Sequence, residues 1–155
     1  MTAPTTTLSD SDLEVIERFH GHICSMVLLG ARMARAASDL LPEGDGGRSL
    51  PFAFFRGYGC AVDGVQIMSG CTWGNGNLTL LRGADFSLLL TVEDSPKAIK
   101  SVPLPDILSD VRTARGTILN TALGELILKG PYEELFTIEE ITGLGELSRY
   151  PGAPK

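Results

Sequence analysis

The segment Phe19-His20-Gly21-His22-Ile23-Cys24 contains both histidines of the chain and one of its three cysteines. In an extended segment the side chains of His20, His22 and Cys24 point to one side, whereas on a helix His20 and Cys24 share a face. Either geometry brings imidazole and thiolate groups together. These groups are preferred ligands of zinc, iron, copper and nickel, and they also form a base and a nucleophile for thiol chemistry. The structural alternative is a helix-capping His20 and a core-packed Cys24.

The other two cysteines, Cys60 and Cys71, flank a second segment with several polar side chains. If residues 60–68 are helical, Cys60, Asp63 and Gln66 follow one another along one face. Burying such a stripe without hydrogen-bond partners would cost free energy, so we expect it to line a pocket. The alternative is a solvated face with Cys60 packed behind it.

Together these motifs resemble the core domain of FmdE, the E-subunit family of formylmethanofuran dehydrogenase. The matching residues follow in order between positions 13 and 90, at 19–24, 30, 32, 60–66, 69–72 and 74–78. The resemblance implies an α+β domain, often dimeric, with its histidine, cysteine, aspartate and glutamine positions gathered at a metal-binding or active-site pocket. It implies no particular reaction.

The chain departs from the family pattern at several positions. Ser25 stands where proline is usual, Asn75 where lysine is common, and Gly83-Ala84 where Gly-Lys is common. Losing positive charge weakens an analogy based on an anionic ligand. Because no cysteine follows Cys71, we expect the core domain without the cysteine-rich zinc finger of longer members.

Two classes of function follow from these residues. In the first, one divalent metal ion is held by His22, Cys24 and Cys60, with His20 or Cys71 as further ligands. Zinc is the expected ion, with iron or nickel as alternatives, and three protein ligands would leave an open position for water or substrate. A haem or an iron–sulfur cluster is less well supported, because the chain has no Cys-x-x-Cys-His motif and no four-cysteine set.

The second class is a metal-free thiol enzyme. Cys60 or Cys24 would then be the nucleophile, a histidine the base, and Asp63 the group that orients it. Cys60 and Asp63 are therefore the candidate catalytic residues. Gln66 and Trp73 are candidate cofactor-binding residues, and Trp73 is expected to form a partly buried wall of the pocket.

Composition limits the remaining choices. The 155 residues, 43% of them hydrophobic, suit one compact domain over residues 11–155 after a flexible arm at 1–10. A net charge of -6 with scattered basic residues argues against nucleic-acid binding. The chain shows neither a secretory signal at its start nor an apolar run long enough for a membrane span, so we expect a cytoplasmic protein with reduced thiols.

The expected elements form an α+β fold, with several helices packed against a small antiparallel sheet. The first helix is capped by Ser9 or Ser11 and interrupted by Gly21, and further helices are predicted at 23–41, 60–68, 106–115 and 117–129. Strands are predicted at 50–56, 78–82 and 86–92, and the last two are expected to pair as a β-hairpin. The acidic tail, 131–155, is expected to be solvated.

Quaternary structure is predicted from one strand and from the family resemblance. The run Leu88-Leu89-Leu90 is apolar on both faces, so helices of the chain or a partner protomer must cover it. We expect a homodimer, with a larger oxidoreductase complex as a further partner.

Overall fold

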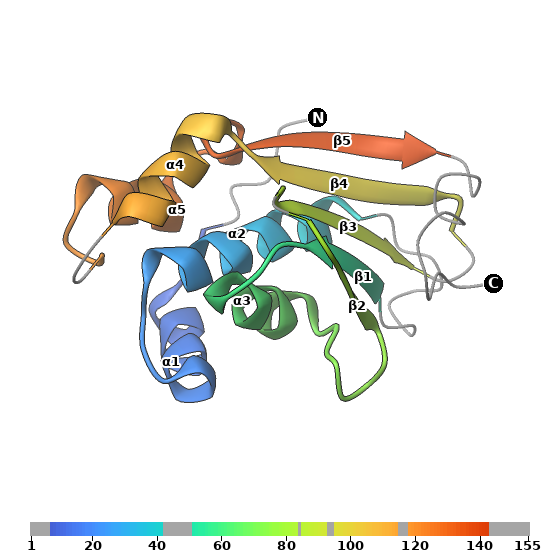
Figure 1. Ribbon diagram of the computed structural model, residues 1–155, viewed down its shortest axis with the longest axis horizontal. Helices are drawn as coiled ribbons and strands as arrows, with labels where there is room; N and C mark the ends of the chain where they lie inside the picture. Colours follow the sequence, from blue (N-terminus) through green and yellow to red (C-terminus); the bar gives the residue numbers. More distant parts are fainter. Residues whose placement is uncertain (1–6, 42–50, 84, 93–94, 115–117, 143–155) are drawn as a thin grey trace.

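The computed structural model describes residues 7–41, 51–83, 85–92, 95–114 and 118–142, and it confirms the α+β class (Figure 1). The helices are α1 (Asp10–His20), α2 (Ser25–Leu40), α3 (Cys60–Ser69), α4 (Pro105–Thr113) and α5 (Ala122–Lys129), with a short 3-10 turn at Tyr132–Glu134. The strands are β1 (Pro51–Arg56), β2 (Leu78–Leu81), β3 (Ser87–Val92), β4 (Lys97–Pro103) and β5 (Phe136–Thr142). Within the described residues, no helix has the length and apolar character needed to cross a bilayer.

The strands form one mixed, mostly antiparallel sheet in the order β2-β1-β3-β4-β5. The predicted hairpin between residues 78–82 and 86–92 is wrong, because β1 lies between these strands, parallel to β2 and antiparallel to β3. The strands run in opposite directions, as a hairpin requires, but they are two strand spacings apart, or roughly 10 Å. The consecutive antiparallel pair is instead β3 and β4.

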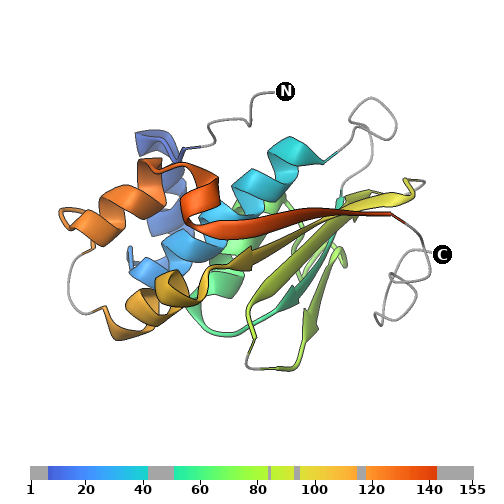
Figure 2. The same ribbon diagram turned by 90° about the horizontal axis from the view of Figure 1, so that it is seen from above.

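Strands β4 and β5 are not among the elements predicted from the sequence, and β5 lies in the tail that is expected there to be solvated. β5 pairs with β4 at one edge of the sheet, beside the helices α4 and α5 in the view from above (Figure 2). Its exposed Glu139 and Glu140 obscure the strand pattern in the sequence. Charged side chains are a common feature of edge strands, and here Lys97 Nζ lies 3.1 Å from Glu140 Oε1.

Local signals explain the first two helices. The Ser9 side chain accepts a hydrogen bond from the Asp12 N–H, and the Asp12 carboxylate accepts one from the Ser9 N–H, which forms a capping box. Gly21 ends α1 with φ of 96°, a backbone conformation that favours glycine. Cys24 is the N-cap of α2, and its sulfur accepts from the Val27 N–H at 3.4 Å. The predicted first and second helices are thus confirmed.

The predicted arm and one later helix differ in detail from the structure. Residues 1–6 of the arm lie outside the described residues, while Leu8 is buried and its N–H donates to the Leu128 carbonyl at 3.0 Å. The helix expected at 117–129 begins only at Ala122, because the Thr121 side chain caps it by accepting from the Gly124 N–H.

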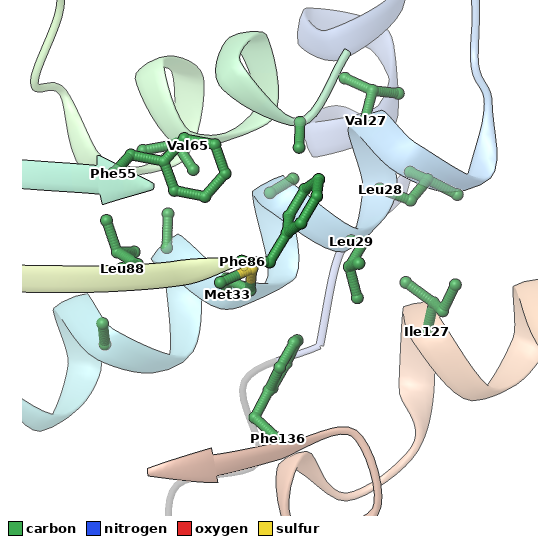
Figure 3. Packing of buried hydrophobic residues seen from close by; sticks show 14 of the residues in the cluster. Val27, Leu28, Leu29, Met33, Phe55, Val65, Phe86, Leu88, Ile127 and Phe136 are labelled. Carbon is green, nitrogen blue, oxygen red and sulfur yellow. The ribbon is translucent and has the colours of Figure 1, made fainter. Parts of the chain in front are cut away.

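Helices α2 and α3 pack on one face of the sheet with their backbones in direct contact. A Cβ atom added at Gly30 would overlap the Ala61 carbonyl oxygen, and one added at Gly64 would overlap the Val27 carbonyl oxygen. Figure 3 shows Val65 of α3 packed near Phe55 and Leu88 of the sheet. Because each helix carries a glycine at the contact, the beginnings of α2 and α3 are held close together.

The apolar strand β3 contributes to both faces of the sheet. Leu88 and Leu90 belong to the main core beneath the helices, whereas Leu89 belongs to a second cluster with Phe54 and Ala98. The chain's own helices therefore cover one face of the strand. The homodimer stays a prediction.

Arg32, one of the positions in the family resemblance, has a structural role. Its buried guanidinium donates to the Ile127 carbonyl at 2.6 Å and to the Gly130 carbonyl at 2.5 Å. A positive group at these carbonyls satisfies the C-terminal end of α5 and complements its dipole. Arg32 thus joins α5 to α2.

Candidate metal centre

The structure brings together His20, His22, Cys24 and Cys60. One potential ligand atom from each residue lies within 4.8 Å of those of the other three. His20 ends α1, and Cys60 begins α3. His22 and Cys24 lie in the connection between α1 and α2, so three separate parts of the chain meet here.

Two glycines with positive φ position these side chains. Gly21 reverses the chain directly after His20, while Gly59, with φ of 69°, directly precedes Cys60. Positive φ at Gly59 would strain a residue with a side chain. The local turns thus orient His20 and Cys60, and the α2–α3 contact brings Cys60 to the segment that carries the histidines.

A chain of hydrogen bonds holds the His20 ring. His20 Nδ1 lies 2.6 Å from Asp63 Oδ2, and the Gln66 Nε2 amide donates to Asp63 Oδ1 at 3.1 Å. The Gln66 Oε1 atom in turn accepts from the Trp73 N–H at 3.0 Å. A carboxylate at Nδ1 favours a proton on that nitrogen, which leaves the lone pair of Nε2 available as a ligand.

His20 Nε2 is buried and has no hydrogen-bond partner among the described residues. A buried polar atom without a partner costs free energy, and such atoms require an explanation in a native structure. A metal ion at the centre of the four side chains would take the free lone pair. The donor chemistry and the unpartnered nitrogen therefore both fit a metal ion.

The two thiols of the cluster are half-buried, while His22 is exposed. Burial raises the pKa of the Cys60 thiol, as do a hydrogen bond with Cys24, the charge of Cys24 and the charge of Asp63. These effects keep Cys60 protonated when no cation is present. The His22 ring lies 4.5 Å from the His20 ring, centroid to centroid, at the exposed side of the cluster.

Cys71 lies outside this cluster. It is buried in the main core, where its thiol donates to the Pro51 carbonyl at 3.0 Å. Burial raises the pKa of Cys71 to about 11. The structure thus places this candidate ligand in an apolar environment and brings the other four candidate ligands together.

Trp73 differs from the sequence-based expectation of a partly buried wall, because its side chain is 74% exposed. The loop that carries it is fixed through Asn75, whose side-chain amide donates to the Gly70 carbonyl at 2.8 Å and accepts from the Thr72 N–H at 3.0 Å. Only the backbone of Trp73 joins the hydrogen-bond chain through Gln66. The indole is therefore presented to solvent.

Comparisons with known proteins agree with this arrangement. The family described as FmdE, molybdenum formylmethanofuran dehydrogenase operon, matches residues 19–137, which include all four clustered side chains. A solved structure of a tungsten formylmethanofuran dehydrogenase FmdE-like protein from Syntrophus aciditrophicus is similar with a TM-score of 0.66 and 26% identity, and the match covers 92% of this chain and 77% of that one.

A curated relative from Archaeoglobus fulgidus matches over a shorter region. It is described as a probable S-adenosyl-L-methionine-binding protein and is 42% identical over 69 residues. The match covers 42% of this chain and 19% of the relative, so the chain spans only about a fifth of that protein's length.

Proposed function

The chain belongs to the FmdE family, and on that premise we propose that it binds one metal ion through His20, His22, Cys24 and Cys60. The unpartnered, buried Nε2 of His20 is the observation that carries the proposal. Two imidazoles and two thiolates suit tetrahedral zinc, so zinc is proposed ahead of iron or nickel.

The surrounding residues have separate roles in this proposal. Asp63 positions His20 through Nδ1, and Gln66 holds Asp63 in place. His22 is the exposed ligand and is the one that water or a substrate would displace. We assign contact with that substrate to Gln66 and to the exposed indole of Trp73.

The proposal extends to partners. The family's description names an operon for formylmethanofuran dehydrogenase, which supports an accessory role beside an oxidoreductase complex of that kind. We also retain the homodimer as a prediction, tested by the mass of the protein in solution.

A metal-free thiol enzyme is the rival account. The His20–Asp63 pair beside Cys60 has the arrangement of a base and the group that orients it. The raised pKa of Cys60, however, leaves it as a thiol at neutral pH, and the thiolate is the nucleophile. A cation would reverse this effect, which favours the metal account.

Anaerobic titration of the metal-free protein with Zn²⁺ tests the proposal, and we expect one ion per chain. Because the Cys60 pKa is raised, binding at neutral pH must release its proton. Below that raised pKa the apparent affinity should therefore increase by at least about tenfold per pH unit. Competition with a chromophoric chelator at several pH values measures this slope. Absence of binding, or an affinity that does not change with pH, would contradict thiolate ligation.

The substitution Asp63→Asn should weaken zinc binding about 10–100-fold while leaving one site per chain. The amide keeps the size of the side chain but removes the charge that favours a proton on His20 Nδ1. The same chelator competition measures the change. Asp110→Asn, at an exposed position of α4, is the matched control. Equal affinities for the two variants would remove Asp63 from the account.

A further inference from the structure

A groove separate from the metal centre lies where β1 ends and β3 and α4 begin. Its volume is about 410 Å³, and its lining includes Arg56, Asp85, Phe86, Ser87 and Lys100 together with aliphatic and proline side chains. This volume lies within the range of small-molecule sites, which combine apolar walls with a few polar groups. None of the four candidate metal ligands lines the groove.

The register of the sheet explains why the polar groups converge. Arg56 pairs with Ser87 across β1 and β3, and Leu89 pairs with Lys100 across β3 and β4. Directly opposed residues share a face of a sheet, as do residues two apart on one strand. Arg56, Ser87 and Lys100 therefore project from the same face, the one that carries Phe54 and Leu89 instead of the helices.

Both cations of the groove lack a carboxylate partner within the described part of the chain. Neither Arg56 nor Lys100 has an ion pair there, whereas Arg35, Lys97 and Lys129 each face a carboxylate. The Nε atom of Arg56 is buried and has no hydrogen-bond acceptor among the described residues. A buried donor of this kind favours an acceptor supplied by a ligand.

Two carboxylates stand nearby and limit the charge of the groove. Asp85 contributes to its lining, and Glu139 is opposite Lys100 across β4 and β5. Neither forms an ion pair with Arg56 or Lys100 among the described residues. The site therefore retains both cationic donors for a ligand, with an acidic group at its margin.

We propose that this groove binds a small organic anion in which a carboxylate or phosphate is attached to an apolar body. Arg56 and Lys100 bind the anionic end, and the Ser87 hydroxyl donates to it. The apolar body lies against Phe86 and the neighbouring aliphatic side chains. Phe86 is a rigid wall, because its ring packs edge-on against Phe55 at 5.9 Å and Tyr58 at 5.1 Å, centroid to centroid.

Calorimetric titration of the whole chain with phenyl phosphate, benzoate and inorganic phosphate tests this site. We expect saturable binding of at least one aromatic anion, and weaker binding of inorganic phosphate because it has no apolar body. A preference between phenyl phosphate and benzoate identifies the anionic group. Affinity should fall as salt is added, since part of the attraction is electrostatic.

Arg56→Gln and Lys100→Gln should each weaken this binding about tenfold or more, because each removes a charge-assisted hydrogen bond. Lys129→Gln removes the same charge from an exposed position on α5 and should leave binding unchanged. Lys100→Gln is decisive if Arg56→Gln fails to fold. Cys60→Ser should also bind the anion normally, which separates this site from the metal proposal.

Three results would overturn the proposal. The first is the absence of saturable binding of all three probes up to the millimolar range. The second is a folded Lys100→Gln variant that binds as tightly as the unaltered chain. The third is an equal loss in Lys100→Gln and Lys129→Gln, which would indicate a general effect of net charge instead of a site.

Discussion

Replacing Cys60 by serine is expected to lower zinc affinity by at least about a hundredfold and to leave the purified protein with little bound metal. Cys60 supplies one of the two thiolates of the cluster and is the only candidate ligand from α3. A serine hydroxyl has nearly the same size but is a poor zinc ligand, and structural zinc sites gain a large free energy from their thiolates. Metal content by elemental mass spectrometry and chelator competition measure the loss.

Cys71→Ser is the matched control for this prediction. Cys71 is buried and donates to the Pro51 carbonyl, a bond that a serine hydroxyl can keep. This variant should retain about one metal ion per chain even if its folding stability falls. Equal metal loss in both variants would mean that any cysteine substitution disturbs the fold, and retention of metal by Cys60→Ser would exclude Cys60 as a ligand.

Replacing Gly64 by alanine is expected to destabilise the fold by about 3 kcal/mol or more and to weaken metal binding as well. The added methyl group would overlap the Val27 carbonyl oxygen and lie 2.5 Å from the Ala31 nitrogen. Both atoms belong to the backbone of α2, so a side-chain rotation cannot relieve the overlap. Helix α2 must move from α3, which separates Cys24 from Cys60. Urea unfolding and zinc titration measure the two effects.

Gly74→Ala provides the comparison for the glycine prediction. A Cβ at Gly74 would lie 3.9 Å from Thr72 Oγ1, an ordinary van der Waals distance, and Gly74 is not among the positive-φ glycines. This variant should stay within about 0.5 kcal/mol of the unaltered chain. If Gly64→Ala proved equally stable, the close helix contact would not be what positions the two thiols.

The parts of the fold that depend on local chemistry can be predicted from the sequence. Ser9 and Gly21 bound α1 through a side-chain cap and a positive φ, which involve only neighbouring residues. The spacing of His20, His22 and Cys24 likewise indicates a donor cluster on its own. Cys60 can be added only through the family resemblance, because no spacing rule relates residues so far apart.

The errors concern contacts between distant segments. The two strands on either side of Gly83 have the composition of a hairpin, but β1 takes the position between them. The value of Gly64 depends on its contact with Val27, which lies in a different helix. The sequence places Trp73 close to Cys71, whereas the hydrogen bonds of Asn75 turn its loop outward. Register and packing of this kind require the folded chain.

The most direct test of the metal centre is X-ray absorption at the metal K-edge of protein purified anaerobically. With about one ion per chain, the account predicts two sulfur ligands near about 2.3 Å and two nitrogen ligands near about 2.0–2.1 Å. That result would match the thiols of Cys24 and Cys60 and the rings of His20 and His22. A coordination shell without sulfur, or a folded protein that takes up no metal, would contradict the account.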